Sequence, residues 1–146
     1  FASFARISPI LPLIGGGKTK FAPVYCVDVG KAITKALELK NTKPKIYEIA
    51  GPENYSFKEL MEILLKEIKK KRFFINVPFN IAKFQSYFLQ MMPKPILTTD
   101  QVELLKYDNV PSEQYPNLND LGIKGKTINS ILPQYIYRFR TYGQFG

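Results

Sequence analysis

The hydrophobic positions along the chain follow the helical period most clearly after Ser56. Apolar residues recur there on one face of a 3.6-residue turn, at Phe57, Leu60, Met61, Leu64, Leu65 and Ile68. Ser56 and Glu59 have the Ser-x-x-Glu spacing of a capping box, in which each side chain accepts a hydrogen bond from the other residue's backbone N–H. We therefore predict a helix that begins directly after Ser56.

Weaker helical patterns occupy four more segments. The pattern that follows Asp28 predicts a helix of about three turns, and Asp28 is expected to be its N-cap rather than a catalytic carboxylate. Further helices are expected over 81–92, over 98–105 with a threonine cap, and over 127–139. Pro133 lies inside the last pattern and is expected to separate its first turn.

Three short runs rich in aromatic and β-branched residues predict strands over 21–27, 45–50 and 73–77. Residues 1–14 fit a short helix that runs into an extended segment, and Gly15–Gly17 fit a turn with positive φ. Strands that alternate with helices indicate an α/β protein. The length of 146 residues fits one domain, 1–146, which could bury roughly 68–70% of its unfolded surface.

The residue types present exclude much chemistry. The chain has no histidine and a single cysteine, Cys26, so the common zinc sets and the Ser-His and Cys-His nucleophile pairs are excluded. The glycine run is no phosphate-binding loop, because position 12 is proline where the Walker pattern needs glycine, and Gly-x-Gly-x-x-Gly is not matched. We therefore predict neither catalytic residues nor a metal site.

Charge and exposed aromatic side chains limit the choice of partners. The chain carries 21 Lys and Arg against 12 Asp and Glu, and the excess lies in residues 1–73. The run Lys69–Arg72 is interpreted as a solvated helix end, with an acidic membrane surface as the alternative. No aromatic and basic residues alternate along a strand, so nucleic acid is not expected. Core packing is favoured over an exposed apolar face for a set on one predicted helix: Phe84, Tyr87, Phe88, Met91 and Met92.

Several motifs in order resemble one protein family. They read LPLIGGGKTKFAPVYCVDVGKAI at 11–33, YEIAGPENYSFKEL at 47–60, TTDQVELLKYDNV at 98–110, LGI at 121–123 and YRFRTYGQF at 137–145. Together they resemble the C-terminal half of an atypical short-chain dehydrogenase/reductase (SDR), of the NAD-dependent epimerase/dehydratase type. The resemblance is strongest to the branch with the accessory NAD(P)H-binding subunit of respiratory complex I and its bacterial relatives.

The resemblance implies a substrate-side subdomain whose Rossmann half is absent from this chain. NAD(P)(H) is expected for the full-length protein and no cofactor for this part alone, which lacks the family's Tyr-x-x-x-Lys pair. Implied partners are the protein's own N-terminal Rossmann half and complex I subunits. The resemblance also implies a cleft lined by Lys18, Lys20, Phe21, Tyr25 and Asp28.

Three functions are compatible with these features. The first is a structural or assembly-related part of a complex I accessory subunit. The second is the substrate domain of an active NAD(P)-dependent epimerase or reductase, and the third is a standalone interaction domain. The expected location is the bacterial cytoplasm, peripheral to the inner membrane, with the matrix side of the mitochondrial inner membrane as the alternative.

Overall fold

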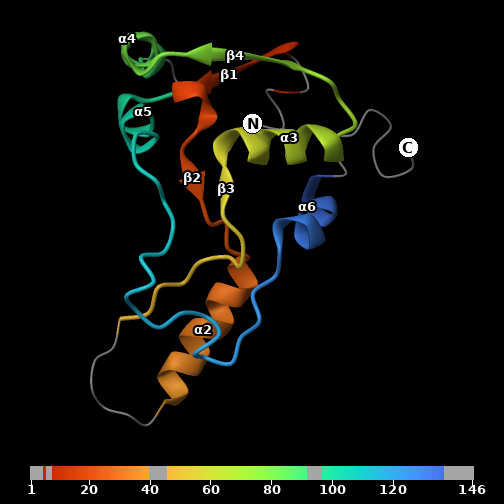
Figure 1. Ribbon diagram of the computed structural model, residues 1–146, viewed down its shortest axis with the longest axis vertical. Coiled ribbons are helices and arrows are strands. Elements are labelled where there is room, and N and C mark those ends of the chain that lie inside the picture. The colour runs from red at the N-terminus through yellow and green to blue at the C-terminus, as the bar shows by residue number, and fades with distance from the viewer. Residues whose placement is uncertain (1–4, 6–7, 40–45, 92–96, 137–146) are drawn as a thin grey trace.

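Short strands and several helices alternate along the chain, so the architecture is mixed α/β (Figure 1). The computed structural model describes residues 5, 8–39, 46–91 and 97–136. The elements in chain order are β1 (Ile10–Ile14), η1 (Gly15–Gly17), β2 (Lys20–Phe21), α2 (Cys26–Glu38), β3 (Tyr55–Ser56), α3 (Phe57–Glu67), β4 (Phe73–Val77), α4 (Phe79–Leu89), α5 (Thr99–Leu104) and α6 (Ile128–Ile136).

Two small ladders connect these elements. β1 pairs in parallel with β4, in a register from Ile10 opposite Phe73 to Ile14 opposite Val77. β2 pairs antiparallel with β3, and Phe57 N–H donates to the Thr19 carbonyl at 2.8 Å. The glycine turn η1 follows β1 directly, and all three glycines have positive φ, as the sequence predicts.

Helix α3 confirms the strongest prediction from the sequence. Glu59 N–H donates to Ser56 Oγ at 3.2 Å, and Ser56 N–H donates to Glu59 Oε2 at 2.7 Å. The predicted apolar face is directed inward, since Phe57, Met61, Leu64, Leu65 and Ile68 are all buried. A second capping box, between Thr98 and Gln101, begins α5.

The apolar interior is divided into four small clusters along an elongated molecule. Two clusters lie between α3 and the strands, a third packs α4 against α5, and a fourth packs α2 against the 118–123 loop (Figure 1). The accessible surface is 10531 Å². A compact monomer of 16.8 kDa would expose about 7,600 Å². The chain therefore leaves far more surface uncovered than its length would require.

Three predicted elements differ from the structure. The predicted strand over 21–27 is wrong beyond Phe21, because α2 already begins at Cys26. The strand expected over 45–50 does not form in its described part, 46–50, where Glu48 N–H bonds only the Pro116 carbonyl of a loop. Pro133 does not divide α6, which continues through it. Phe139 lies outside the described residues, and so does most of the helix expected near the N-terminus.

The aromatic residues of α4 are also placed differently from the expectation. The sequence favoured core packing, yet Phe84, Tyr87, Phe88 and Met91 are exposed, and Met92 lies outside the described residues. Small residues, Ala82 and Ser86, form the buried side instead. Within the described ranges, no helix has the length and apolar character needed to cross a membrane.

Candidate functional site

The N-terminal turn of α2 gathers two of the residues that the resemblance marks as cleft lining. Tyr25 is the N-cap, with extended backbone, and the helix begins at Cys26. Asp28 is therefore not the cap that the sequence predicts, because it lies inside the first turn and its own N–H donates to the Tyr25 carbonyl at 2.9 Å. A carboxylate in this turn is still favoured by the helix dipole.

Asp28 connects α2 to a segment almost a hundred residues later. The side chain is 1% exposed, and Oδ2 accepts a hydrogen bond from the backbone N–H of Lys126 at 2.9 Å. Oδ1 lies 3.5 Å from Lys31 Nζ, close enough for an ion pair but without hydrogen-bond geometry among the described residues. The buried carboxylate thus fixes the loop after Ile123 against the start of α2.

Two side chains that sequence analysis did not assign to the site lie beside Tyr25. Lys126 Nζ lies 5.3 Å from the centre of the Tyr25 ring, a cation–π distance. A hydrogen bond with Tyr25 raises the pKa of Tyr135 above its usual value. Tyr135 belonged to the apolar pattern of the last helix, so its spacing indicated packing and gave no sign of this contact.

The remaining candidates lie in β2 and just before it. Phe21 packs edge-to-face on Phe57, with ring centres 6.4 Å apart, and borders a groove of about 520 Å³. Lys20 is exposed, while its backbone N–H donates to Asp108 Oδ1 at 2.8 Å. Lys18 is exposed at the end of the glycine turn. The structure therefore places the five candidates in two groups, Tyr25 with Asp28 and Phe21 with Lys20, and Lys18 outside both.

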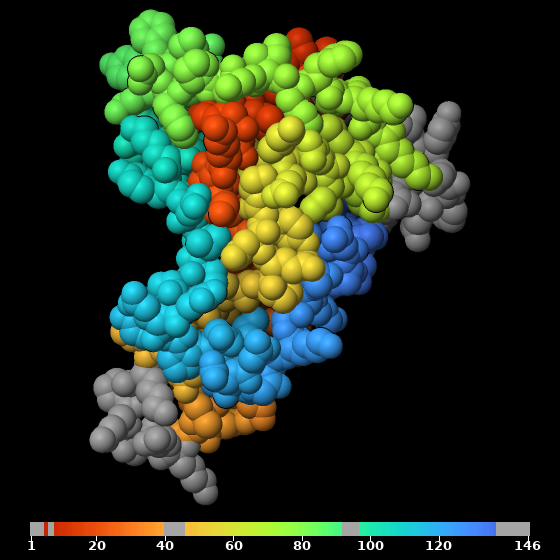
Figure 2. Space-filling view, in the orientation of Figure 1, coloured from red at the N-terminus to blue at the C-terminus, as the bar shows by residue number. Residues whose placement is uncertain are grey.

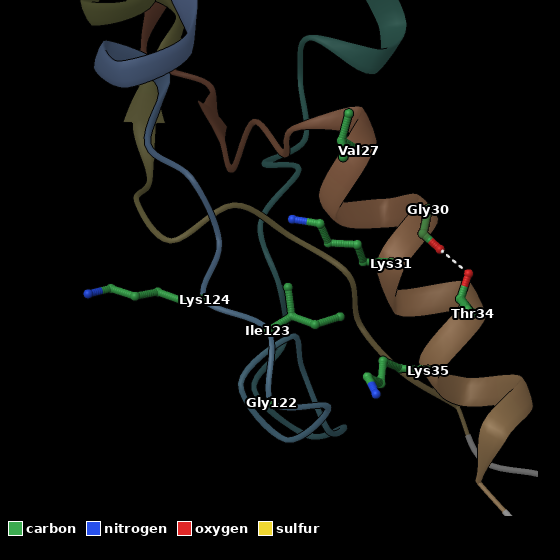
Figure 3. A pocket seen from close by; sticks show the side chains of 8 residues that line it. All are labelled: Val27, Gly30, Lys31, Thr34, Lys35, Gly122, Ile123 and Lys124. Carbon is green, nitrogen blue, oxygen red and sulfur yellow. Dashed lines mark hydrogen bonds between the residues drawn. The ribbon is translucent and has the colours of Figure 1, made fainter.

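A larger groove runs along α2 and has a basic lining. Its volume is about 690 Å³, and α2 contributes Val27, Gly30, Lys31, Thr34 and Lys35 while the loop contributes Gly122, Ile123 and Lys124 (Figure 3). Figure 3 shows Lys31 and Lys35 along the helix, with the loop of Ile123 and Lys124 across from them. No carboxylate lines this groove, so its charge suits an acidic surface.

The glycine turn and the first turn of α2 are both lined closely by the chain's own groups. A phosphate cradle needs open space over its glycines, but a Cβ on Gly15 would meet the Phe79 ring at 2.4 Å, and one on Gly17 would meet Lys58 at 3.1 Å. The N-terminus of α2 already holds the Asp28 carboxylate, which repels a pyrophosphate. Among the described residues, no group of three or more acidic or cysteine side chains could hold a metal ion.

Comparison with known proteins gives a consistent set of relatives. No family model matches the chain. It is 32% identical to the NADH dehydrogenase [ubiquinone] 1 alpha subcomplex subunit 9, mitochondrial, of Arabidopsis thaliana, over all of this chain and 39% of that protein. It is 31% identical to the NADH-ubiquinone oxidoreductase 40 kDa subunit of Neurospora crassa over 86% of this chain, and 26% identical to the mouse subunit 9 over 90%.

The chain spans little more than a third of the length of these relatives, which it matches in their C-terminal part. The relatives agree with the branch that the motifs indicate. Over its whole length, this chain is similar to the C-terminal part of mitochondrial NADH–ubiquinone oxidoreductase accessory subunits.

Proposed function

We propose that this chain is the C-terminal, substrate-side part of an SDR-like, NAD(P)-binding accessory subunit of NADH–ubiquinone oxidoreductase, with a structural or assembly role. The observation that carries the proposal is the similarity to such subunits over all of the chain. The structure supports a non-catalytic role, because the cluster at the start of α2 uses its carboxylate and one of its phenols to join chain segments.

Helix α2 forms a lobe together with the segment 46–50 and the 118–123 loop that pack on it, and we call this part the α2 lobe. Its outer side is the surface proposed to meet the N-terminal Rossmann half. Large apolar side chains are exposed there, on α2 and on the extended segment beside it: Val27, Ile33, Leu37, Leu39 and Ile46. Leu37 is 82% exposed, and together these side chains form an apolar patch of the kind that marks an interaction surface. The relatives are more than twice as long as this chain, so a partner of suitable size is available within one polypeptide.

Four of the five candidate cleft residues fit this arrangement as the margin of an interdomain cleft. Tyr25 and Asp28 lie at the start of the same helix whose outer face is apolar, and Lys20 and Phe21 precede it in the chain. Ligands commonly bind at domain interfaces. The NAD(P)(H) expected for the full-length protein is proposed to be held by the other half, because this chain lacks the Gly-x-Gly-x-x-Gly pattern of a dinucleotide site.

The proposed location is the membrane-bound enzyme itself. The relatives are named as mitochondrial proteins. This favours the matrix side of the mitochondrial inner membrane over the bacterial cytoplasm as the location of this protein. The subunits of that enzyme are the proposed partners.

The proposal is tested by tagging the full-length protein in its own cells and separating detergent extracts on native gels. We expect the tagged protein to migrate with NADH–ubiquinone oxidoreductase activity. The double variant Ile33→Gln, Leu37→Gln should lose this association, because it weakens the proposed packing of the two halves. Tyr115→Gln, which changes an exposed aromatic residue of the 109–120 loop, should keep it. Migration of the wild-type protein away from the enzyme would refute the proposal.

A further inference from the structure

Helix α4 has two apolar faces, and the structure covers only one of them. Ala82, Ser86 and Val102 are buried where α4 packs on α5. The opposite face carries a stripe of exposed side chains, Ile81, Phe84, Tyr87 and Phe88, which spans about 120° at 100° per residue, and Met91, two residues past the end of the helix, is also exposed. Phe84 is 69% exposed and Phe88 57% exposed. A helix that is apolar on both sides needs a second apolar environment.

The stripe is itself ordered by aromatic contacts. Phe84 and Phe88 lie edge-to-face with centres 5.2 Å apart, and Tyr87 and Phe88 do so at 5.9 Å. These contacts hold three rings together as one patch on the surface, which we call the α4 patch (Ile81, Phe84, Tyr87, Phe88 and Met91). Figures 1 and 2 show α4 at one extreme end of the molecule, away from the α2 lobe.

Exposed apolar side chains also occur on β4, the strand that connects a basic run to α4. Phe73 and Ile75, which are alternate residues of β4 and so share a face, are both exposed. Immediately before them, Lys69–Arg72 carry four positive charges, and Figure 1 shows this connection leading into β4 along the same end of the molecule as α4. Five residues of strand separate the run from α4, a distance of about 17 Å.

Charge distinguishes between the possible occupants of this surface. Helix α4 contains no acidic residue, and its one charged side chain, Lys83, pairs with Glu103 at 3.6 Å. An apolar, aromatic helix face with basic residues at its margin suits the boundary between lipid headgroups and acyl chains. Tyrosine and phenylalanine are typical of that boundary, and lysines nearby are attracted to anionic headgroups.

We propose that the α4 patch and the Lys69–Arg72 run together form a surface that docks on an anionic lipid bilayer. The patch enters the headgroup boundary with α4 lying in the plane of the membrane, while the basic run contacts the headgroup charge. The inference goes beyond the proposed function, because it rests on the two surfaces of this chain and not on its relatives.

The test is sedimentation of the full-length protein with vesicles of phosphatidylcholine alone and of equimolar phosphatidylcholine and phosphatidylglycerol. We expect binding to the anionic vesicles and weaker binding as salt shortens the Debye length below its value of about 8 Å at physiological ionic strength. The double variant Phe84→Gln, Phe88→Gln should bind about tenfold more weakly. The double variant Lys69→Gln, Lys71→Gln should lose the preference for anionic vesicles while its residual binding becomes independent of salt.

A matched pair of single variants controls for the loss of an exposed aromatic side chain. Tyr87→Gln changes the α4 patch, and Tyr115→Gln makes the same substitution in the 109–120 loop. We expect only Tyr87→Gln to weaken vesicle binding. Absence of wild-type binding to both kinds of vesicle would overturn the proposal, as would equal binding by the Phe84 and Phe88 double variant. If that variant instead loses self-association or binding to a subunit, the patch is a protein interface.

These results are independent of the proposed function. Vesicle binding uses purified protein and lipid alone, whereas the native gel reports association with the enzyme. Loss of vesicle binding with intact migration on the gel would refute only the lipid surface, and the reverse result would refute only the assignment to the enzyme.

Discussion

A buried carboxylate usually marks either catalysis or a structural connection, and Asp28 is used for the second. Asp28 Oδ2 accepts a hydrogen bond from the backbone N–H of Lys126, a residue 98 positions later in the chain. The contact joins the loop to the start of α2 and so helps to define the geometry of the loop. The neighbouring Lys31 supplies the opposite charge at the mouth of the site.

We expect Asp28→Asn to keep most of the stability and Asp28→Ala to lose about 1–3 kcal/mol. The amide oxygen of asparagine can still accept from Lys126 N–H, whereas alanine leaves that partly buried donor without a partner. Urea denaturation of both variants measures the difference. Equal losses in the two variants would show that the negative charge, not the hydrogen bond, holds the loop.

Two glycines are expected to respond oppositely to alanine. A Cβ on Gly51 would lie 1.9 Å from the carbonyl oxygen of Pro23, which is backbone and cannot turn aside, so Gly51→Ala should destabilise by about 1–3 kcal/mol. Gly30 lies within α2 with nothing within 4 Å of the added carbon, so Gly30→Ala should stabilise by about 0.5–1 kcal/mol. Thermal melting of the pair tests both signs, and a gain from Gly51→Ala would contradict the close approach.

At the scale of the element, α3 is specified by neighbouring residues. Its start depends on side chains three positions apart and its inner face on one periodic pattern, so both were predictable. The helix ends at a strained residue, because Lys69 adopts a φ of 54°, a backbone conformation in which glycine is usual. The Lys69 N–H donates to the Lys66 carbonyl at 3.2 Å, and the Lys70 N–H donates to the Leu65 carbonyl at 3.0 Å.

The capping box should make the stability of the fold depend on pH. Hydrogen bonds from the Ser56 backbone and hydroxyl hold the pKa of Glu59 below its usual value of 4.5. Because the folded pKa is the lower one, this contribution is complete above 4.5 and is lost as the pH falls through the folded value. Melting temperatures measured from neutral pH into that range should fall less steeply for Glu59→Gln than for the wild type.

Ser56→Ala provides the control for this prediction. It removes the hydroxyl that accepts from Glu59 N–H and should cost about 1 kcal/mol at neutral pH. An identical acid dependence in the wild type and in Glu59→Gln would mean that other carboxylates dominate the acid transition.

The segment 46–50 shows why elements can fail even when their residues are suitable. Its aromatic and β-branched residues favour an extended backbone, and Glu48 N–H donates to the Pro116 carbonyl of a loop at 2.8 Å. A strand also needs a second strand beside it, and the described part of this chain supplies none there. The preference for an extended backbone depends on the residues of the segment itself, whereas strand pairing depends on which other segments lie beside it.

At the scale of the whole molecule, the chain exposes apolar surface at two opposite ends. The α2 lobe carries Ile33, Leu37 and their neighbours, and α4 carries its aromatic patch. Because these surfaces lie far apart (Figure 1), one partner of ordinary size does not cover both. The two proposals therefore assign them to different environments, the Rossmann half and the lipid bilayer.

We expect the chain by itself to bind NAD(H) and NADP(H) more weakly than about 10 μM, or roughly −7 kcal/mol. It offers no open glycine turn, and a carboxylate occupies the first turn of α2. Calorimetric titration tests this, with the full-length protein as the positive control. Tighter binding by the chain alone would contradict the division into a cofactor half and a substrate-side half.

The sequence by itself determined the elements whose cause is local. It predicted α3 with its capping box, the threonine-capped α5 and the positive-φ glycine turn, because each depends on residues a few positions apart. It also predicted the strand at 73–77 from the preference of its residues, and β1 supplies the partner strand. Composition also sufficed to exclude histidine chemistry, and the order of the motifs indicated the relatives that the comparisons found.

Only the tertiary structure decided the features that depend on distant residues. It paired Asp28 with Lys126, placed Tyr135 on Tyr25, and directed the aromatic side of α4 outward. Periodicity shows that α4 has apolar faces, but which face is covered depends on where α5 packs. The same reason explains why the residues of 46–50 favour a strand although none forms there. Local residues determine the preference for an extended backbone, but a strand forms only where a second strand lies beside it.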